Sequence, residues 1–127
     1  MEIKLKFLLF FCLFVSLQNS ISSDFISKAF DEAMIDFDSG KTSPAIKKWT
    51  DLAESGHSDS AFYLGSIYYF GDGLPVNFPL ALKLFRKAAE KNHAASQFML
   101  GLMYAEGHGV DKNLEITVDW FDKAVRK

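Results

Sequence analysis

The chain has 127 residues, which is enough for one domain. Its 14 lysines and arginines nearly balance 16 aspartates and glutamates, which excludes the strongly basic surface typical of nucleic-acid-binding proteins. With 13 Phe, 4 Tyr and 2 Trp residues, the chain has too much apolar surface for a disordered polar protein.

Residues 1–23 have the layout of a secretory signal peptide. Lys4 and Lys6 form a basic start, residues 7–17 are a nearly unbroken apolar run, and the small, polar sequence QNSISS follows. Because an apolar run of 11 residues is short for a membrane span, we expect cleavage near Ser22 and no stable membrane anchor afterwards. An uncleaved anchor is the alternative. The prediction is therefore a secreted or periplasmic protein.

The only cysteine, Cys12, lies inside this apolar run. The mature chain would therefore contain no disulfide bond, no cysteine-based zinc site and no thiol nucleophile. The three histidines do not form a cluster with the spacing of metal ligands. We expect neither a metal ion nor a cofactor.

Two stretches that lie 36 residues apart share one pattern, LGSIYYFGDGL at positions 64–74 and LGLMYAEGHGV at positions 100–110. A fixed period of this length is typical of stacked helix pairs. We expect the mid-helix glycines to allow a close approach of another helix, and the later glycines to end the helix and turn the chain. The shared positions are Gly65, Tyr68, Gly71 and Gly73 in the first copy and Gly101, Tyr104, Gly107 and Gly109 in the second.

Apolar residues at helical spacing predict six helices after the signal peptide. Their expected ranges are 24–39, 43–55, 59–70, 78–92, 95–106 and 114–126. The predicted fold is all-α, a short right-handed α–α superhelix of about three antiparallel helix pairs that follows the signal peptide helix. The units are a degenerate pair at 24–58 and full repeats at 59–94 and 95–127.

Several polar residues stand where helices are expected to begin. Asn77 and Asn113 occupy the same place in the two full repeats and are candidate N-caps. In the first unit, Ser43 is the candidate N-cap, and Pro44 follows it at a first-turn position.

The pattern of the two full repeats resembles the Sel1-like repeat, a relative of the tetratricopeptide repeat. The matching residues of the first copy are Ala61, Leu64, Gly65, Tyr68, Gly71, Gly73, Leu74, Ala81, Phe85, Lys87, Ala88 and Ala89. The resemblance is weaker over 24–58, where the short turn is closer to a tetratricopeptide repeat. The resemblance implies a non-catalytic adaptor that holds another protein or peptide, often in bacterial envelopes or eukaryotic secretory compartments. The nearly balanced charge separately predicts no nucleic-acid partner.

The histidines offer little support for catalysis. His57 and His93 share one register, where we interpret them as helix caps or surface residues, and His108 is expected at an exposed loop tip. Ser55, His57 and Asp59 contain the residue types of a hydrolase, but side chains two positions apart on a helix point to different sides. The alternative to an adaptor is a secreted hydrolase or β-lactam-binding enzyme on the same scaffold. The cysteine pairs of such relatives are missing from this sequence.

Two surfaces are candidates for partner binding. Phe30, Phe62, Tyr69 and Phe98 fall at similar positions on the first helices of the pairs, which in such stacks line the concave side. Helical aromatic stripes are also common in cores, and that is the alternative.

The second candidate is the last helix. Val118, Phe121 and Val125 are expected to cover the interior of their own pair, whereas Leu114 and Trp120 are expected at an uncovered end. The counterpart of Trp120 in the preceding repeat is Leu84, which we assign to the contact with the following repeat. Since an uncovered apolar end tends to bind a partner, we predict docking or homodimerisation there.

Overall fold

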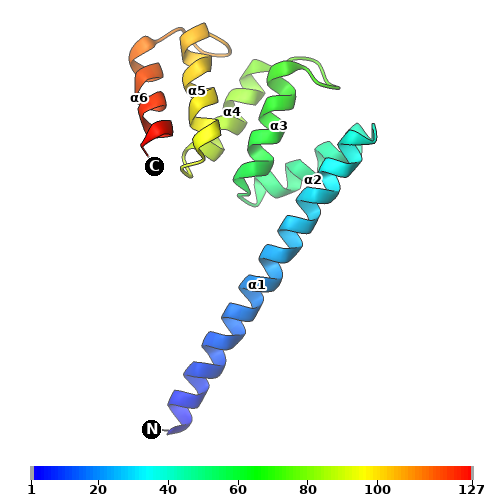
Figure 1. The fold of residues 1–127 in the computed structure, drawn as a ribbon, viewed down its shortest axis with the longest axis vertical. Helices are drawn as coiled ribbons and strands as arrows, with labels where there is room; N and C mark the ends of the chain where they lie inside the picture. The colour runs from blue at the N-terminus through cyan, green and yellow to red at the C-terminus, as the bar shows by residue number, and fades with distance from the viewer. Residues whose placement is uncertain (1, 127) are drawn as a thin grey trace.

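The computed structural model describes residues 2–126, in which all regular secondary structure is α-helical. The helices are α1 (Glu2–Asp38), α2 (Thr42–Glu54), α3 (Ser58–Phe70), α4 (Phe78–Ala89), α5 (Ala94–Glu106) and α6 (Leu114–Val125). They stack in chain order as three pairs, α1 with α2, α3 with α4 and α5 with α6 (Figure 1). This confirms the all-α solenoid of helix pairs.

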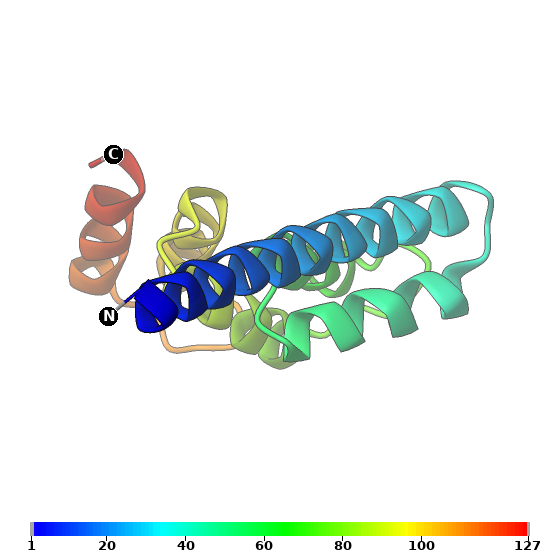
Figure 2. The same cartoon turned by 90° about the horizontal axis from the view of Figure 1, so that it is seen from below.

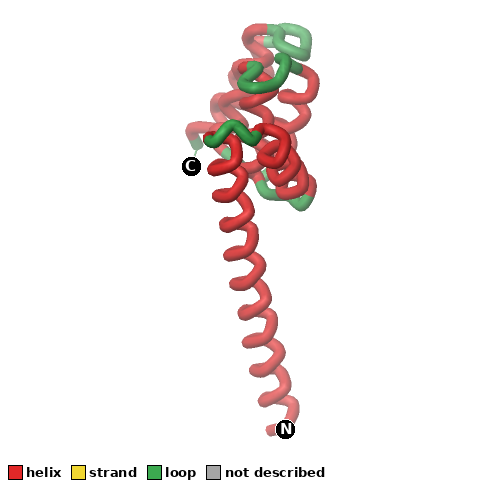
Figure 3. The backbone as a smooth tube through the Cα atoms, turned by 90° about the vertical axis from the view of Figure 1, so that its right-hand side faces the viewer, coloured by secondary structure: helices red, strands yellow, loops and turns green. Residues whose placement is uncertain are grey.

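Helix α1 is continuous, so the predicted signal segment and the predicted helix 24–39 form one element. Its N-terminal part extends away from the solenoid (Figures 1 and 3), and side chains become half-buried only from Ile26 onwards. The helix is long and apolar enough to cross a membrane by length and composition, a test that signal sequences also pass. The structure is therefore compatible with a signal peptide at 1–23.

The core runs between pairs as well as within them. Ala33, Trp49, Leu64 and Ile67 join α1, α2 and α3 in one cluster. Ala81, Phe85, Met99 and Met103 join α4 and α5 in a second cluster. Because each pair covers part of its neighbour, the helices form one stack, and Figure 2 shows this stack from below.

The mid-helix glycines lie at close helix contacts, but the contact is with the second helix of the same pair. A Cβ atom on Gly65 would lie 3.0 Å from Cε1 of Phe85, and one on Gly101 would lie 2.6 Å from Cδ1 of Phe121. Both glycines are buried. The aromatic ring of each second helix therefore occupies the space that a side chain on the first helix would need.

The repeated loop is held by the same bonds in both full repeats. The N–H groups of Asn77 and Asn113 donate to the carbonyl oxygens of Tyr68 and Tyr104 at 2.8 and 2.9 Å. The helices end at left-handed glycines, with φ values of 71° at Gly71 and 72° at Gly107, a conformation that residues with a Cβ rarely adopt. Gly73 and Gly109 also have positive φ.

Two of the three predicted N-caps are confirmed. The side chains of Asn77 and Asn113 accept hydrogen bonds from the backbone N–H groups of Leu80 and Ile116, each at 3.1 Å. The prediction for Ser43 is wrong, because α2 already begins at Thr42 after Lys41, which makes no side-chain cap. The N–H of Lys41 bonds to the Asp36 carbonyl at 2.8 Å, and this tight turn starts the next helix early.

Candidate functional site

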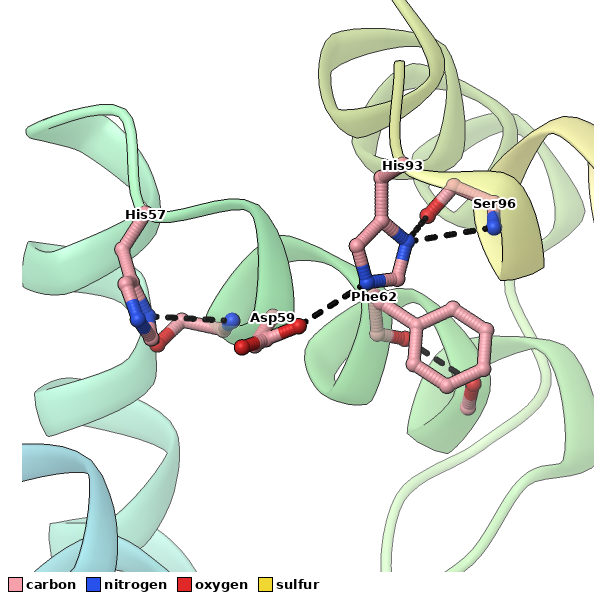
Figure 4. A network of polar contacts seen from close by, with 7 residues as sticks. His57, Asp59, Phe62, His93 and Ser96 are labelled. Carbon is pink, nitrogen blue, oxygen red and sulfur yellow. Dashed lines mark hydrogen bonds and ion pairs between the residues drawn. The ribbon is translucent and has the colours of Figure 1, made fainter. Parts of the chain in front are cut away.

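Two histidines hold the junctions between helix pairs (Figure 4). Nδ1 of His57 accepts from the Ser60 N–H at 3.3 Å, and Nδ1 of His93 accepts from the Ser96 N–H at 3.2 Å. These bonds cap α3 and α5, which confirms the interpretation of both histidines as caps. Nε2 of His93 also lies 2.9 Å from Oδ1 of Asp59. Because Nδ1 is an acceptor, Nε2 carries the proton and donates to the carboxylate.

The arrangement Asp59–His93–Ser96 has the residue types of a hydrolase triad, with Oγ of Ser96 2.9 Å from Nδ1. Ser96 is 0% exposed, however, and a serine without access to solvent cannot attack a substrate. Ser60 beside His57 is likewise 0% exposed. Both groups cap helices, and neither places a nucleophile at the surface.

Ser55, His57 and Asp59 do not converge, as the sequence spacing indicated. The Ser55 hydroxyl donates to the Leu52 carbonyl at 2.7 Å, whereas Asp59 bonds to His93 at the start of α5. No group of three or more metal-ligating side chains occurs in the part of the chain that the structure describes.

The prediction that His108 is an exposed loop tip is wrong. Its ring stacks on Phe78 with centroids 4.4 Å apart and planes 3° apart, and its Nδ1 lies 2.9 Å from the Tyr69 hydroxyl. Burial raises the pKa of the Tyr69 phenol above its ordinary value, and its hydroxyl shares a hydrogen bond with the imidazole of His108. The loop of the last repeat therefore packs onto the preceding pair, an arrangement that adjacent glycines make possible.

A groove of about 590 Å³ lies between α1 and α3, on the side formed by the first helices of the pairs. Trp49 from α2 forms part of its lining, with Phe37 on α1 and Tyr63 on α3. Phe70, which is 68% exposed, and the carboxylates of Asp38 and Asp72 complete the outer part. The site is thus aromatic inside and acidic at its edge.

Trp49 is 1% exposed, and its Nε1–H has no hydrogen-bond partner among the described residues. A buried donor without an acceptor costs about 1–3 kcal/mol. The corresponding positions of the two full repeats carry Phe85 and Phe121, which have no such donor. The first pair is therefore the only one of the three with an N–H group at this register.

Ion pairs join α1 and α2. Nζ of Lys48 on α2 lies 2.8 Å from Oδ2 of Asp36 on α1 and 3.5 Å from Oε2 of Glu32. The hydrogen bond from Lys48 holds the pKa of the Asp36 carboxyl below its usual value, and the same bond raises the pKa of Lys48. The pair therefore carries its full charge at neutral pH.

The residues predicted on the concave side are engaged in aromatic contacts. Phe30 packs on Tyr63 with centroids 5.4 Å apart, Phe62 packs on Phe85 at 5.9 Å, and Tyr69 contacts Phe78 at 5.3 Å. Phe98 is 51% exposed, but its ring stacks on Phe121 at 5.2 Å. None of the four lines the groove between α1 and α3.

The groove is lined instead by Tyr63 and Phe70, each one position after a predicted residue. A signal for them was present, since residues 63 and 70 lie seven positions apart and share one helix face with Ser66 and Ile67.

The last helix presents a different face from the one expected. Val118 and Val125 are 58% and 78% exposed, so they do not cover the interior of their own pair. Leu114 is 69% exposed and lies on the same face. The uncovered ridge of α6 is therefore Leu114, Val118 and Val125.

Trp120 is half-buried, and Nζ of Lys123 lies 4.2 Å from the centre of its ring. Its counterpart Leu84 packs against the clusters around Leu64 and Ala61, which precede it in the chain. The assignment of Leu84 to the following repeat is thus wrong, which removes the register argument for placing Trp120 at the open end. By analogy with Leu84, we expect Trp120 to face earlier repeats.

Comparison with known families matches the Sel1 repeat at residues 58–93 and 94–127. The chain is similar to a Sel1 repeat protein from Oxalobacter formigenes, with 32% identity over 64% of this chain and 62% of that protein and a TM-score of 0.62. It also resembles c5321, a protective antigen with an SLR fold from uropathogenic Escherichia coli, with 24% identity over 81% of this chain and 23% of that protein and a TM-score of 0.72. The latter likeness concerns the fold. No curated protein sequence matches the chain.

Proposed function

Because the chain belongs to the Sel1 repeat family, we propose that it is an exported, non-catalytic module that binds another protein or a peptide. Proteins of this family are generally protein-interaction modules. The observation that carries the proposal is the open aromatic groove between α1 and α3, where Tyr63 and Phe70 remain exposed. The residues predicted on the concave side make aromatic contacts within the stack; they are Phe30, Phe62, Tyr69 and Phe98.

Export is supported by the N-terminal part of α1. Its side chains from Ile3 to Phe25 are exposed although most of them are apolar, so they need either a membrane or removal. A signal peptide at 1–23 accounts for both the basic start and the apolar run. Processing can be followed by intact-mass measurement of the product from exporting cells, where loss of about 22 residues is expected from the position of the small residues. A membrane-bound, full-length product would support the anchor instead.

The alternative of a secreted hydrolase or β-lactam-binding enzyme has less support. Both serines that contact a histidine are buried, and each histidine already caps a helix. Incubation of the purified protein with nitrocefin and with simple esters separates the two functions. Turnover above that of a Ser96→Ala variant would favour the enzyme.

The binding proposal itself is tested by affinity capture from the exported fraction of the source cells. Phe70→Asp and Leu114→Asp form a matched pair, since both replace strongly exposed apolar residues, at the groove and at α6 respectively. We expect a protein to be retained by the wild type and lost with one of the two substitutions. Failure of the wild type to retain any protein after crosslinking would contradict the proposal.

The uncovered ridge of α6, formed by Leu114, Val118 and Val125, is a candidate interface for a homodimer. Glu115 and Asp119 lie toward the start of the helix, while Lys123 and Arg126 lie toward its end. An antiparallel pairing of two α6 helices would place opposite charges together and Val118 against its own copy.

A further inference from the structure

We propose that the groove between α1 and α3 binds a short extended peptide segment in which an aromatic or long aliphatic residue is flanked by lysine or arginine, with a peptide carbonyl accepting the Nε1–H of Trp49. This inference rests on the proposed function and names the partner chemistry of its site. It follows from three independent features of the groove, namely its unpaired donor, its charge and its aromatic lining.

The first feature is the indole donor of Trp49. The ring lines the groove, is almost fully buried and has no acceptor among residues 2–126. The packing at this register does not need the nitrogen, because Phe85 and Phe121 fill it in the other pairs. The nitrogen is closed off from solvent in the free chain, so a peptide carbonyl, an acceptor that every extended segment supplies, would satisfy the donor once the residues over it move aside.

The second feature is a one-sided charge. Two carboxylates, those of Asp38 and Asp72, line the groove, and no lysine, arginine or histidine lines it. Neither carboxylate forms an ion pair with any residue that the structure describes. Acidic partners would therefore be repelled, while lysine or arginine on the partner would find unpaired charges of opposite sign.

The third feature is the size and lining of the space. About 590 Å³ is within the usual range of roughly 300–1,000 Å³ for binding pockets, and it is enough for a few side chains but not for a folded domain. Phe37, Tyr63 and Phe70 supply ring faces to this space. Such walls suit an aromatic or long aliphatic side chain, and cationic groups also bind favourably over aromatic faces.

The test uses the chain as exporting cells deliver it and a fluorescein-labelled peptide of sequence GRFLRG, with GDFLDG and GRGGRG as matched controls. Fluorescence anisotropy at low salt measures the dissociation constants. We expect GRFLRG to bind at least 10-fold more tightly than either control, and raising the salt to about 0.5 M to weaken it. Equal binding of the three peptides would overturn the proposal.

Two variants separate the contributions. Trp49→Phe keeps the ring that the sister repeats use and removes the donor, so binding of GRFLRG should weaken about 3- to 10-fold without loss of helical content. Asp38→Asn with Asp72→Asn keeps the shape and should weaken GRFLRG by a similar factor while improving GDFLDG. Unchanged affinity in both variants would show that the peptide does not occupy this groove.

The outcomes also separate this inference from the proposed function. If a cellular protein is retained by the wild type and by Phe70→Asp, the chain binds a partner elsewhere, and only the groove proposal fails. If the groove is instead filled by a second copy of the chain, self-association will depend on concentration and disappear in the variant that combines Asp38→Asn with Asp72→Asn. That result would replace the peptide as the occupant.

Discussion

Nε2 of His93 lies 2.9 Å from Oδ1 of Asp59, a bond that joins the first turn of α3 to the N-cap of α5 across 34 residues of sequence. The same imidazole accepts the N–H of Ser96 through its other nitrogen. One side chain therefore both starts a helix and links two consecutive helix pairs, α3–α4 and α5–α6. His57 starts α3 in the same way but has no carboxylate partner among the described residues.

This difference makes His57 the control for His93. Replacing His57 with Ala should cost about 1 kcal/mol of unfolding free energy, as expected for loss of an N-cap. His93→Ala should cost roughly 0.5–1 kcal/mol more, because it also removes the bond to Asp59, whose side chain is largely exposed. Urea denaturation measures both values. Equal costs for the two substitutions would show that the bond between His93 and Asp59 contributes nothing to stability.

The two mid-helix glycines should respond differently to substitution by alanine. At Gly65 the added Cβ meets the edge of Phe85 at 3.0 Å, which a small ring shift can relieve, and alanine gains up to about 1 kcal/mol in helix propensity. At Gly101 the Cβ would lie 2.6 Å from Phe121 and 3.3 Å from the Thr117 carbonyl oxygen. We expect Gly65→Ala to be nearly neutral and Gly101→Ala to lose about 1–3 kcal/mol. Thermal melts that rank them in the reverse order would contradict these contacts.

The Asp36–Lys48 ion pair should contribute to stability in an acid-sensitive way. The pKa of Asp36 is lower in the folded state than its unfolded value of about 3.8, so its contribution is present above that value. It is lost as pH falls through the lower folded pKa. The melting temperature of the wild type should therefore fall more between about pH 5 and pH 2 than that of Asp36→Asn. Asp31→Asn, which removes a carboxylate without an ion pair among residues 2–126, should retain the wild-type profile.

The exposed ridge of α6 predicts which substitution controls self-association. Val118→Lys should shift sedimentation toward the monomer, because Val118 is 58% exposed at the middle of the ridge. Trp120→Lys should instead lower stability, because Trp120 is half-buried. If Val118→Lys leaves a dimer of unchanged strength, the ridge is not the interface.

The sequence period predicted much of the fold because each repeat needs the same local features. The predicted range 59–70 for α3 differs from Ser58–Phe70 by one residue, and Asn77 and Asn113 cap the helices as expected. The predicted end of α4 at 92 was too late, because Glu90 already caps this helix. Local signals of this kind lie within one helix or turn.

The direction in which a side chain faces was harder to predict. Successive residues on a helix are rotated by about 100°, so an error of one position exchanges Phe62 for Tyr63 and the core for the groove. The 36-residue offset paired Trp120 with Leu84 correctly but could not say which neighbour covers Leu84. The unpaired donor of Trp49 and the bond between His93 and Asp59 depend on contacts between elements far apart in the sequence.

Site-specific photo-crosslinking in the cells that export the chain tests the central claim, that this is a protein-binding module whose groove takes the partner. A benzophenone side chain is placed at Phe70 beside the groove and, in separate experiments, at Leu114 on α6 and at Asp111 as a surface control. The account predicts a discrete protein adduct from position 70 that a 100-fold excess of GRFLRG peptide suppresses, and none from position 111. Adducts from position 114 alone, or none from any position, would contradict it.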